Sequence, residues 1–258
     1  MGSGTSKPDV SIITPLYNSE HCFPATAESV LAQTFTNFEW IIVNDCSTDG
    51  TGEMLDALAR RDGRVHVVHL SQNQGPIFAR NCAMGAAAGR FIAFIDGDDL
   101  WLPEKLEKQI SYMLSSGAHL PYTSFRKISS NGSGKLSPLI KAPPRAPYDR
   151  ILRSDYMMAS SVVFDTEVTG RILQSDEAPI GKDDFHFFLQ ILKKHGPAHG
   201  LGDDLCRLRI SGDSVTGAKL KSAWLQWYFY RRVIGLSFVS SLGHFVVYAV
   251  KGLYKYLR

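Results

Sequence analysis

Three carboxylates lie within four residues of this 258-residue chain, at Asp96, Asp98 and Asp99. They follow the apolar run 91–95, which predicts a buried strand. Carboxylates this close repel one another and raise one another's pKa unless a cation is bound. Hard oxygen ligands at this density suit Mg²⁺ or Mn²⁺ held together with a substrate phosphate. The cluster therefore predicts a metal-assisted site for a phosphate-containing substrate.

Polar residues also follow the strands predicted at 10–14 and 38–43. Helix capping is one explanation, because several of these residues precede predicted helices: Asn18, Thr48, Asp49 and Asp99. Capping needs a single carboxylate, so it does not explain three of them at 96–99. We therefore expect the strand ends to form a site.

Strands and helices alternate over the first hundred residues, with strands expected at 10–14, 38–43, 65–70 and 91–95 and helices at 22–33, 54–60 and 77–88. This alternation predicts an α/β fold with a mostly parallel sheet flanked by helices. Ligands of such sheets bind outside the carboxyl ends of the strands, where the acidic cluster lies.

The second half is less regular. Helices are expected at 106–114 and 185–194, and short strands at 121–125, 160–164 and 205–210. The Gly-, Ser- and Pro-rich stretch 129–147 predicts an exposed loop.

Composition and charge exclude several classes of protein. With 44% hydrophobic and 21% charged residues the chain is ordinary globular material. Four cysteines without metal-ligand spacing favour a reduced, cytoplasmic compartment. The net charge of +3 combines about −4 in residues 1–213 with +7 in the rest, because no acidic residue follows Asp213. A mildly acidic body with a wholly basic tail argues against a nucleic-acid partner, because the basic patch of such a protein would lie on the folded body.

No glycine-rich phosphate loop of the G-x-G-x-x-G or G-K-[ST] kind is present. A dinucleotide dehydrogenase and a P-loop ATPase are therefore disfavoured. A nucleotidyltransferase would also be expected to carry a phosphate loop after its first strand, yet it remains an alternative. So does a non-catalytic protein that binds nucleotide sugars.

Ordered motifs through the first 110 residues resemble the family 2 glycosyltransferases, which are inverting enzymes with a nucleotide-binding GT-A fold. The matching stretches are VSIITPLYN at 10–18, VLAQTF at 30–35, IIVNDCSTDGT at 41–51, NQGPIFARN at 73–81 and AAGRFIAFIDGDDLWLPEKL at 87–106. The second half matches at GKDD, 181–184, and RISGDSVT, 209–216.

The resemblance implies a site for a nucleotide sugar, with UDP-sugars favoured. It places nucleotide contacts on Pro15, Tyr17, Asn18, Asp45, Arg80 and Asp96. Tyr17 would lie beside the base, Asp45 would accept from the uracil N–H, and Asp96 would reach the ribose. For Arg80 an ion pair on a helix surface is an equal alternative.

Asp96-Gly97-Asp98 matches the family's D-x-D motif. The resemblance implies that Asp98 holds Mn²⁺ or Mg²⁺ and that Asp99 either supports this metal or caps the next helix. At 209–214, Ser211 stands where the family often has histidine, so contact at that edge would come from Arg209 or Asp213.

The resemblance also implies a catalytic base in the pair Asp183–Asp184, with Asp184 the better candidate. A neighbouring carboxylate raises proton affinity, which suits a general base. Helix capping is the alternative role, and Asp203–Asp204 is a competing acidic pair. The implied reaction moves a sugar, with inversion, to a hydroxyl of a glycan or lipid-linked acceptor in bacterial surface polysaccharide synthesis.

We expect residues 1–9 to be a flexible N-terminus or a remnant of cloning. Residues 10–215 would form the transferase domain, divided into a nucleotide-binding half, 10–110, and an acceptor-binding half, 111–215. Residues 216–258 would form an amphipathic, basic helical tail.

Polar residues of the tail recur at helical spacing and form one stripe: Ser237, Ser241, His244, Tyr248, Lys251, Lys255 and Arg258. The rest of the circumference is apolar. This pattern favours binding of residues 223–258 to an anionic membrane surface. The protein would then be peripheral on the inner face of the cell membrane. The alternative is that the apolar face packs on the domain or on a second protomer.

Overall fold

The computed structural model describes residues 7–129, 135–153, 156–179, 181–210 and 217–254. Its first half alternates strands and helices as predicted: β1 (Val10–Leu16), α1 (Phe23–Leu31), β2 (Phe38–Asn44), α2 (Thr51–Arg61), β3 (Val65–His69), α3 (Pro76–Ala86), β4 (Phe91–Phe94), β5 (Leu100–Trp101) and α4 (Lys105–Ser116). The predicted α/β fold is confirmed.

The second half contains shorter elements around two long strands and one long helix. They are β6 (Pro121–Ser129), β7 (Arg145–Ala146), α5 (Tyr148–Leu152), a 3-10 turn (Ala159–Ser161), β8 (Val163–Asp165), α6 (Thr166–Thr169), α7 (Asp183–His195) and β9 (Ala198–Ile210). The tail comprises α8 (Gly217–Tyr228), a π-helical turn (Phe229–Val233) and α9 (Phe238–Tyr254).

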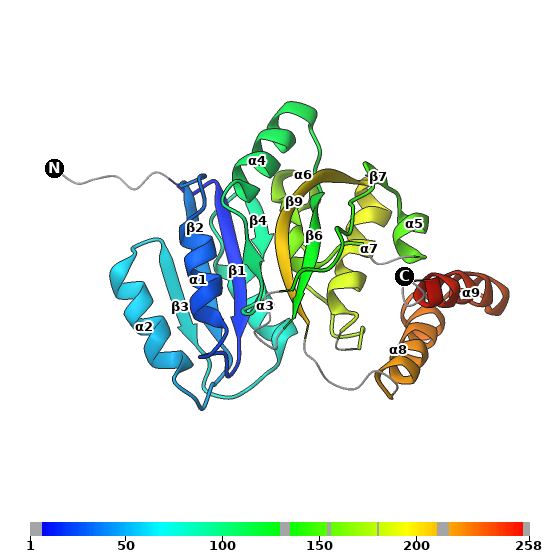
Figure 1. The fold of residues 1–258 in the computed structure, drawn as a ribbon, viewed down its shortest axis with the longest axis horizontal. Coiled ribbons are helices and arrows are strands. Elements are labelled where there is room, and N and C mark those ends of the chain that lie inside the picture. Colours follow the sequence, from blue (N-terminus) through cyan, green and yellow to red (C-terminus); the bar gives the residue numbers. More distant parts are fainter. Residues whose placement is uncertain (1–6, 130–134, 154–155, 180, 211–216, 255–258) are drawn as a thin grey trace.

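The main sheet has the strand order β3-β2-β1-β4-β8. Its first four strands are parallel, and β8 at the edge runs antiparallel to β4. A second sheet has the order β5-β9-β6, and β7 pairs with β9. The two sequence halves interlock, because β8 completes the sheet of the first half and β5 joins the sheet of the second. Figure 1 shows β1 descending to the lower edge of the main sheet, so the carboxyl ends of its parallel strands lie there.

Helices cover both faces of the main sheet, which explains why β1, β2 and β4 are almost entirely buried. Residues of β1 alternate between two buried clusters: Val10 and Ile12 face one cluster, and Ile13 faces the other. Helices α1, α2 and α4 complete the first cluster, and α3, α5 and α7 complete the second.

The predicted exposed loop 129–147 is partly wrong. Residues 135–146 pack beside β6, where Ile140 and Phe125 exchange two backbone hydrogen bonds of 3.2 and 2.9 Å. Ala146 is fully buried in β7. The strand predicted at 160–164 instead begins as a 3-10 turn and becomes β8 only at Val163.

The tail packs against residues of the second half of the chain through its π-helical turn. Phe229 and Tyr230 are fully buried, and the Tyr230 hydroxyl donates to the Leu152 carbonyl over 2.7 Å. In Figure 1, α8 lies to the lower right and α9 lies at the right-hand end of the molecule. Across the described residues, we find no helix with the length and apolar character that crossing a bilayer requires.

Candidate active site

Arg80 of α3 joins acidic residues from both halves of the sequence. Its Nη2 lies 2.6 Å from Asp96 Oδ1, and its Nη1 lies 2.9 Å from both Asp183 Oδ2 and Asp184 Oδ1. The Arg80 side chain is only 6% exposed. The alternative of an ion pair on the helix surface is therefore wrong: Arg80 is buried between the acidic motif after β4 and the start of α7.

Asp183 and Asp184 occupy the first turn of α7, where free backbone N–H groups and the helix dipole stabilise negative charge. The Gly181 N–H donates to Asp183 Oδ1 over 2.9 Å, so Asp183 also holds the turn that enters the helix. Asp183 is buried, whereas the Asp184 side chain keeps about a quarter of its surface exposed. Asp184 is thus the member of the pair that a substrate can reach.

The environment of Asp184 suits proton transfer near neutral pH. Burial, together with the charges of Asp96 and Asp183, raises the pKa of Asp184 to about 7, against the opposing effects of Arg80 and Gln174. Gln174 Nε2 donates to Asp184 Oδ1 over 2.8 Å. A carboxyl group titrating near 7 is matched to the role of a general base.

Gln174 is itself fixed by Asn81, the neighbour of Arg80 on α3. The Asn81 amide donates to the Gln174 carbonyl over 2.9 Å and accepts from the Gln174 N–H over 2.8 Å. Helix α3 therefore orients the Asp184 carboxylate twice, once through Arg80 and once through Asn81 and Gln174. Sequence reasoning missed Gln174 because it lies outside the family motifs and in no periodic segment.

The acidic motif after β4 is fixed by close packing at Gly97. A Cβ atom at this position would lie 2.0 Å from Leu16 Cδ2, and Leu16 is buried at the end of β1. Thr26 Oγ1 of α1 donates to the Gly97 carbonyl over 3.0 Å. The glycine thus allows Asp96 and Asp98 to lie directly beside the end of β1.

Asp99 contacts protein donors with both carboxylate oxygens. Ser160 Oγ donates to Oδ2 over 2.5 Å, and the Arg209 N–H donates to Oδ1 over 2.8 Å. The prediction that Asp99 caps a helix is wrong, because β5 follows it and α4 begins only at Lys105. The geometry instead favours a supporting role, in which Asp99 ties the acidic motif to β9.

Ser160 is a second residue that sequence reasoning missed. Its hydroxyl accepts from the Asp96 N–H over 3.0 Å while donating to Asp99. Its carbonyl accepts from Trp101 Nε1 over 2.7 Å. A buried serine in a predicted strand gave no signal of this role, which depends on the 3-10 turn bringing it to the acidic motif.

Asp98 differs from its neighbours in that, among the described residues, only its own backbone N–H donates to its carboxylate. Burial and the charge of Asp96 raise the pKa of Asp98. A cation would relieve both effects, so this half-buried carboxylate fits a metal ligand. Within the described part of the chain, no three His, Cys, Asp or Glu side chains are grouped as a metal site. That is compatible with Mg²⁺ or Mn²⁺, which bind through one or two carboxylates plus substrate phosphates.

Four of the six predicted nucleotide contacts, Pro15, Tyr17, Asn18 and Asp45, gather at the ends of β1 and β2. Pro15 lies in β1, and Tyr17 is exposed just beyond it. Asn18 has a positive φ of 48°, and its Oδ1 accepts from the Thr48 N–H over 2.8 Å. Asn18 does not cap α1, which begins at Phe23; it links the loops that follow the two strands.

Asp45 is buried and accepts from two backbone groups of the loop before α3. The N–H groups of Gln74 and Gly75 donate to its two oxygens over 2.7 and 2.8 Å. Gly75 adopts a φ of +85°, a conformation that favours glycine. Each carboxylate oxygen has a second lone pair, so this anchoring leaves acceptor capacity for a base.

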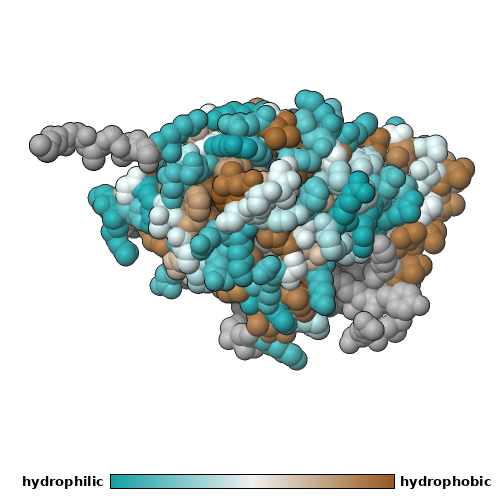
Figure 2. All heavy atoms as spheres, turned by 90° about the horizontal axis from the view of Figure 1, so that it is seen from above, coloured by the Kyte–Doolittle hydropathy of each residue, from teal (hydrophilic) through white to brown (hydrophobic). Residues whose placement is uncertain are grey.

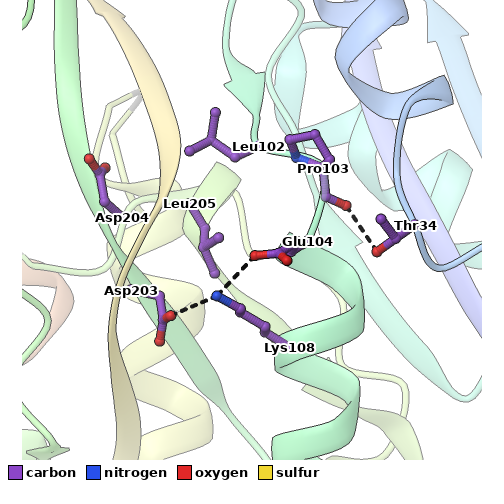
Figure 3. Close-up of a pocket in the computed structure, with 8 residues that line it drawn as sticks. All are labelled: Thr34, Leu102, Pro103, Glu104, Lys108, Asp203, Asp204 and Leu205. Atoms are coloured by element: carbon purple, nitrogen blue, oxygen red, sulfur yellow. Dashed lines mark hydrogen bonds and ion pairs between the residues drawn. The ribbon is translucent and has the colours of Figure 1, made fainter.

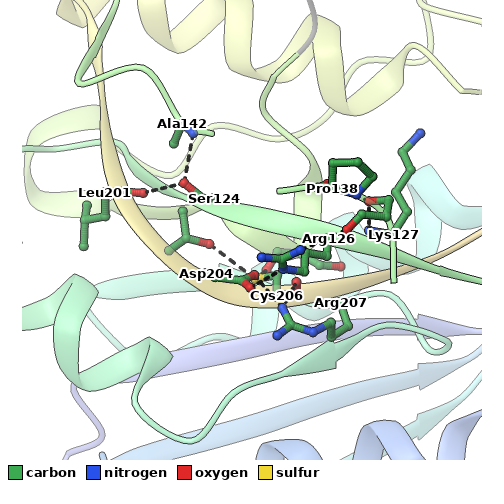
Figure 4. A network of polar contacts seen from close by, with 12 residues as sticks. Ser124, Arg126, Lys127, Pro138, Ala142, Leu201, Asp204, Cys206 and Arg207 are labelled. Carbon is green, nitrogen blue, oxygen red and sulfur yellow. Dashed lines mark hydrogen bonds and ion pairs between the residues drawn. The ribbon is translucent and has the colours of Figure 1, made fainter. Parts of the chain in front are cut away.

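The competing acidic pair Asp203–Asp204 lies within β9 and is neutralised by protein cations. Lys108 Nζ lies 2.9 Å from Asp203 Oδ1. Figure 4 shows Arg126 and Arg207 both reaching Asp204, over 2.7 and 2.5 Å. These contacts indicate a structural role in the second sheet.

A hollow of about 500 Å³ lies beside this pair and is shown in Figure 3. Its lining comes from the start of α4, from β9 and from Thr34: Thr34, Leu102, Pro103, Glu104, Lys108, Asp203, Asp204 and Leu205. Of its acidic groups, Glu104 and Asp203 are paired with Lys108, and Asp204 is paired with arginines. None of the predicted site residues lines it. The hollow is therefore separate from the cluster that Arg80 forms with Asp96, Asp183 and Asp184, which we call the Arg80 cluster.

Arg209 contributes to the edge of the site that lacks the family's histidine. Its Nε donates to the Asp98 carbonyl over 3.0 Å. Ser211 and Asp213 lie outside the described residues.

The family model described as "Glycosyl transferase family 2" matches residues 11–161, more than half of the chain. The chain belongs to glycosyltransferase family 2. It is similar to TuaG of Bacillus subtilis, whose name assigns it to teichuronic acid biosynthesis, with 37% identity covering 97% of this chain and 98% of that protein.

This family 2 glycosyltransferase is also similar to WfgD of Escherichia coli, a UDP-Glc:alpha-D-GlcNAc-diphosphoundecaprenol beta-1,3-glucosyltransferase. The identity is 35%, covering 84% of this chain and 83% of WfgD.

Solved structures share the fold. TarS 1–349 of S. aureus, in complex with UDP, has a TM-score of 0.67 and 22% identity, covering 93% of this chain and 70% of that one. The mannosyltransferase PcManGT of Pyrobaculum calidifontis, in complex with GDP-Man and Mn²⁺, has a TM-score of 0.68 and 17% identity, covering 90% and 66%.

Proposed function

We propose that this glycosyltransferase moves a sugar from a UDP-sugar to a hydroxyl of a glycan or lipid-linked acceptor, with inversion, in bacterial surface polysaccharide synthesis. The observation that carries the proposal is the Arg80 cluster, which brings Asp184 together with the acidic motif at Asp96. A base beside a nucleotide site is what a transferase needs and a passive binding protein does not. The names of TuaG and WfgD support the same class of pathway.

The nucleotide would bind across the carboxyl ends of β1, β2 and β4. The exposed Tyr17 ring would lie beside the base, and Pro15 and Asn18 would shape the same loop. The second lone pairs of the buried Asp45 carboxylate would accept from the uracil N–H. A UDP donor is supported by the UDP complex of TarS and by the name of WfgD.

Asp96 would contact the ribose with the carboxylate oxygen that Arg80 leaves free, since Arg80 contacts only Oδ1. Arg80 itself would lie behind the nucleotide and keep Asp96 and Asp184 in fixed positions. Its positive charge would also partly compensate the carboxylates around it.

Asp98 would hold Mn²⁺ or Mg²⁺, with Asp99 supporting it through the bonds to Ser160 and Arg209. When bound, such an ion supplies positive charge to the diphosphate leaving group. The GDP-Man and Mn²⁺ complex of PcManGT supports a divalent ion in this fold.

Asp184 would accept the proton of the acceptor hydroxyl as its oxygen attacks the anomeric carbon. The bond to the nucleoside diphosphate breaks in the same step, and UDP leaves from the opposite face of the sugar. Arg80 and Gln174 hold the carboxylate still, so a single displacement with inversion needs no covalent sugar–enzyme intermediate.

The relatives and the tail support the proposed acceptor and location. WfgD is named for a diphosphoundecaprenol acceptor, which supports a lipid-linked acceptor here. We place the protein at the inner face of the cell membrane, attached peripherally.

Release of UDP tests the function. Purified protein with Mn²⁺ is incubated with a panel of UDP-sugars and a diphosphoundecaprenol-linked sugar, and UDP and the glycolipid product are measured. Acceptor-dependent UDP release with a lengthened, inverted product is expected. Pyrophosphate release from a sugar phosphate and UTP would instead indicate a nucleotidyltransferase, and binding without turnover would indicate a binding protein.

A further inference from the structure

Part of the tail's polar stripe faces the rest of the protein: Ser241, His244 and Tyr248 are buried or half-buried, whereas Ser237 is exposed. Ser241 is fully buried, and the His244 ring packs against the Tyr230 ring at a centroid distance of 5.9 Å. The Tyr248 hydroxyl lies 3.2 Å from Ser222 Oγ of α8. The apolar face of α9 packs on its own domain only in part: Phe245 lies against the core, whereas Val239, Leu242, Val246 and Val250 are exposed.

The opposite face of α9 is apolar and exposed. Val239, Leu242, Val246 and Val250 recur along one side of the helix, and Val239 is 79% exposed. Trp224 and Tyr228 of α8 are also exposed and stack at a centroid distance of 5.5 Å. Brown side chains lie among paler ones at the right-hand end of the molecule in Figure 2, where Figure 1 places α9. We call these six residues the tail face.

Charge identifies the occupant of the tail face. No acidic residue lies in residues 214–258, which carry seven basic residues. Arg231 and the exposed Arg232 lie in the turn between α8 and α9. Apolar helix faces with aromatic residues and uncompensated basic charge bind anionic bilayers. A second copy of the chain would instead oppose two such positive tails, and like charges disfavour that contact.

The tail is joined to the helix that begins with Asp183 and Asp184. The Phe229 ring packs against the Phe185 ring at 5.3 Å and against the His186 ring at 5.9 Å. The Lys182 ammonium lies 5.3 Å from the centre of the Phe185 ring and 5.8 Å from that of Tyr248. A surface that binds the tail face is thus held beside the start of α7.

We propose that the tail face is a docking surface for an anionic lipid bilayer. It lies in the bilayer interface and brings the start of α7 to the membrane, where a lipid-linked acceptor is presented. This rests on the proposed function for the acceptor alone; the lipid contact itself follows from the tail.

Vesicle flotation of the full chain tests the proposal. The vesicles contain phosphatidylcholine alone or phosphatidylcholine mixed with phosphatidylglycerol. We expect flotation with the anionic vesicles, little with the neutral ones, and a decrease at high salt because screening weakens the charge term. The double variant Leu242→Glu/Val246→Glu should lower partitioning into anionic vesicles by about tenfold or more, since burying one such side chain is worth roughly a decade in affinity.

Two controls separate lipid binding from other effects. Leu114→Glu on α4 changes a side chain that is equally apolar and 64% exposed but lies far from the tail in sequence and fold, and it should float like the wild type. UDP affinity measured by calorimetry should be the same in all variants. This reports on the nucleotide site independently, so failure of flotation is distinguishable from failure of the proposed function.

The proposal is overturned if the full chain stays unbound with anionic vesicles, or if the double variant floats as well as the wild type. A dimer in light scattering that the double variant converts to a monomer, without vesicle binding, would also overturn it and assign the tail face to a second copy.

Discussion

Arg80 Nη1 donates a hydrogen bond to Asp184 Oδ1 over 2.9 Å, although 103 residues separate the two in the chain. The same guanidinium contacts Asp96, so a single buried cation sets the relative positions of the nucleotide-binding motif and the proposed base. Burial penalises the charge of Arg80, but the three carboxylates outweigh this penalty and raise its pKa. Arg80 therefore stays charged throughout the working pH range.

Replacing Asp184 by Asn should separate turnover from binding. The variant keeps the shape of the side chain but cannot accept the proton, so we expect kcat to fall by ~10²–10⁴ while UDP affinity is unchanged. Steady-state kinetics and calorimetry measure the two quantities. Asp203→Asn is the matched control, because Asp203 pairs with Lys108 away from the cluster. An equal loss of binding and turnover would contradict the assignment of Asp184 as the base.

The activity of the wild type should rise as the pH increases through about 7. Burial raises the pKa of Asp184 to about 7, and only the ionised form can accept a proton. The same shift lowers the stability of the protein at high pH, because the pKa of Asp184 is higher in the folded than in the unfolded chain. The stability that protonated Asp184 contributes is complete below its pKa in the unfolded chain and is lost as the pH rises through about 7. The pH profile of kcat measures the first effect.

Gln174→Ala should move this profile to higher pH, since the Gln174 hydrogen bond lowers the pKa of Asp184. Gln190→Ala, on the helix that carries Asp184, serves as the control because Gln190 contacts His186 and not the acidic cluster. A shift to lower pH, or the same shift in both variants, would show that Gln174 does not act through Asp184.

Ser160→Ala should weaken UDP binding in the presence of Mn²⁺. It removes the hydroxyl that accepts from the Asp96 N–H and donates to Asp99, and leaving such buried groups unpaired costs about 1–3 kcal/mol. Ser161→Ala is the control: Ser161 lies in the same 3-10 turn, but its hydroxyl donates to Met158. Both variants should lose stability in urea unfolding. Only Ser160→Ala should also lose UDP affinity, and equal affinities would limit Ser160 to a structural role.

Gly97→Ala should destabilise the protein and impair the site. The added methyl group would overlap Leu16 Cδ2, and overpacking of a core costs about 1–3 kcal/mol. Urea unfolding measures this cost, and Gly63→Ala is the control because a Cβ at Gly63 meets nothing within 4 Å. Equal midpoints for the two variants would mean that the end of β1 yields easily to the extra volume.

Much of the fold was predictable because it follows from local sequence patterns. The buried parallel strands are mainly apolar, as at Ile12 and Ile41, and each alternates with a helix. The stretch 129–147 was not predictable in the same way. Its turn-forming composition describes the chain locally, whereas its backbone hydrogen bonds to Phe125 come from a long-range contact.

For the site, the sequence by itself determined which groups could do chemistry: Asp96, Asp98 and Asp184 stand in family motifs, and the basic character of the tail is a matter of composition. Tertiary structure decided how they are used. It buried Arg80 among three acids, gave Asp99 to Ser160 and Arg209, and recruited Gln174 from a segment with no motif. It also turned the apolar face of α9 outward. Helical periodicity defines two faces of a helix, but only packing against the rest of the chain determines which of them meets the protein.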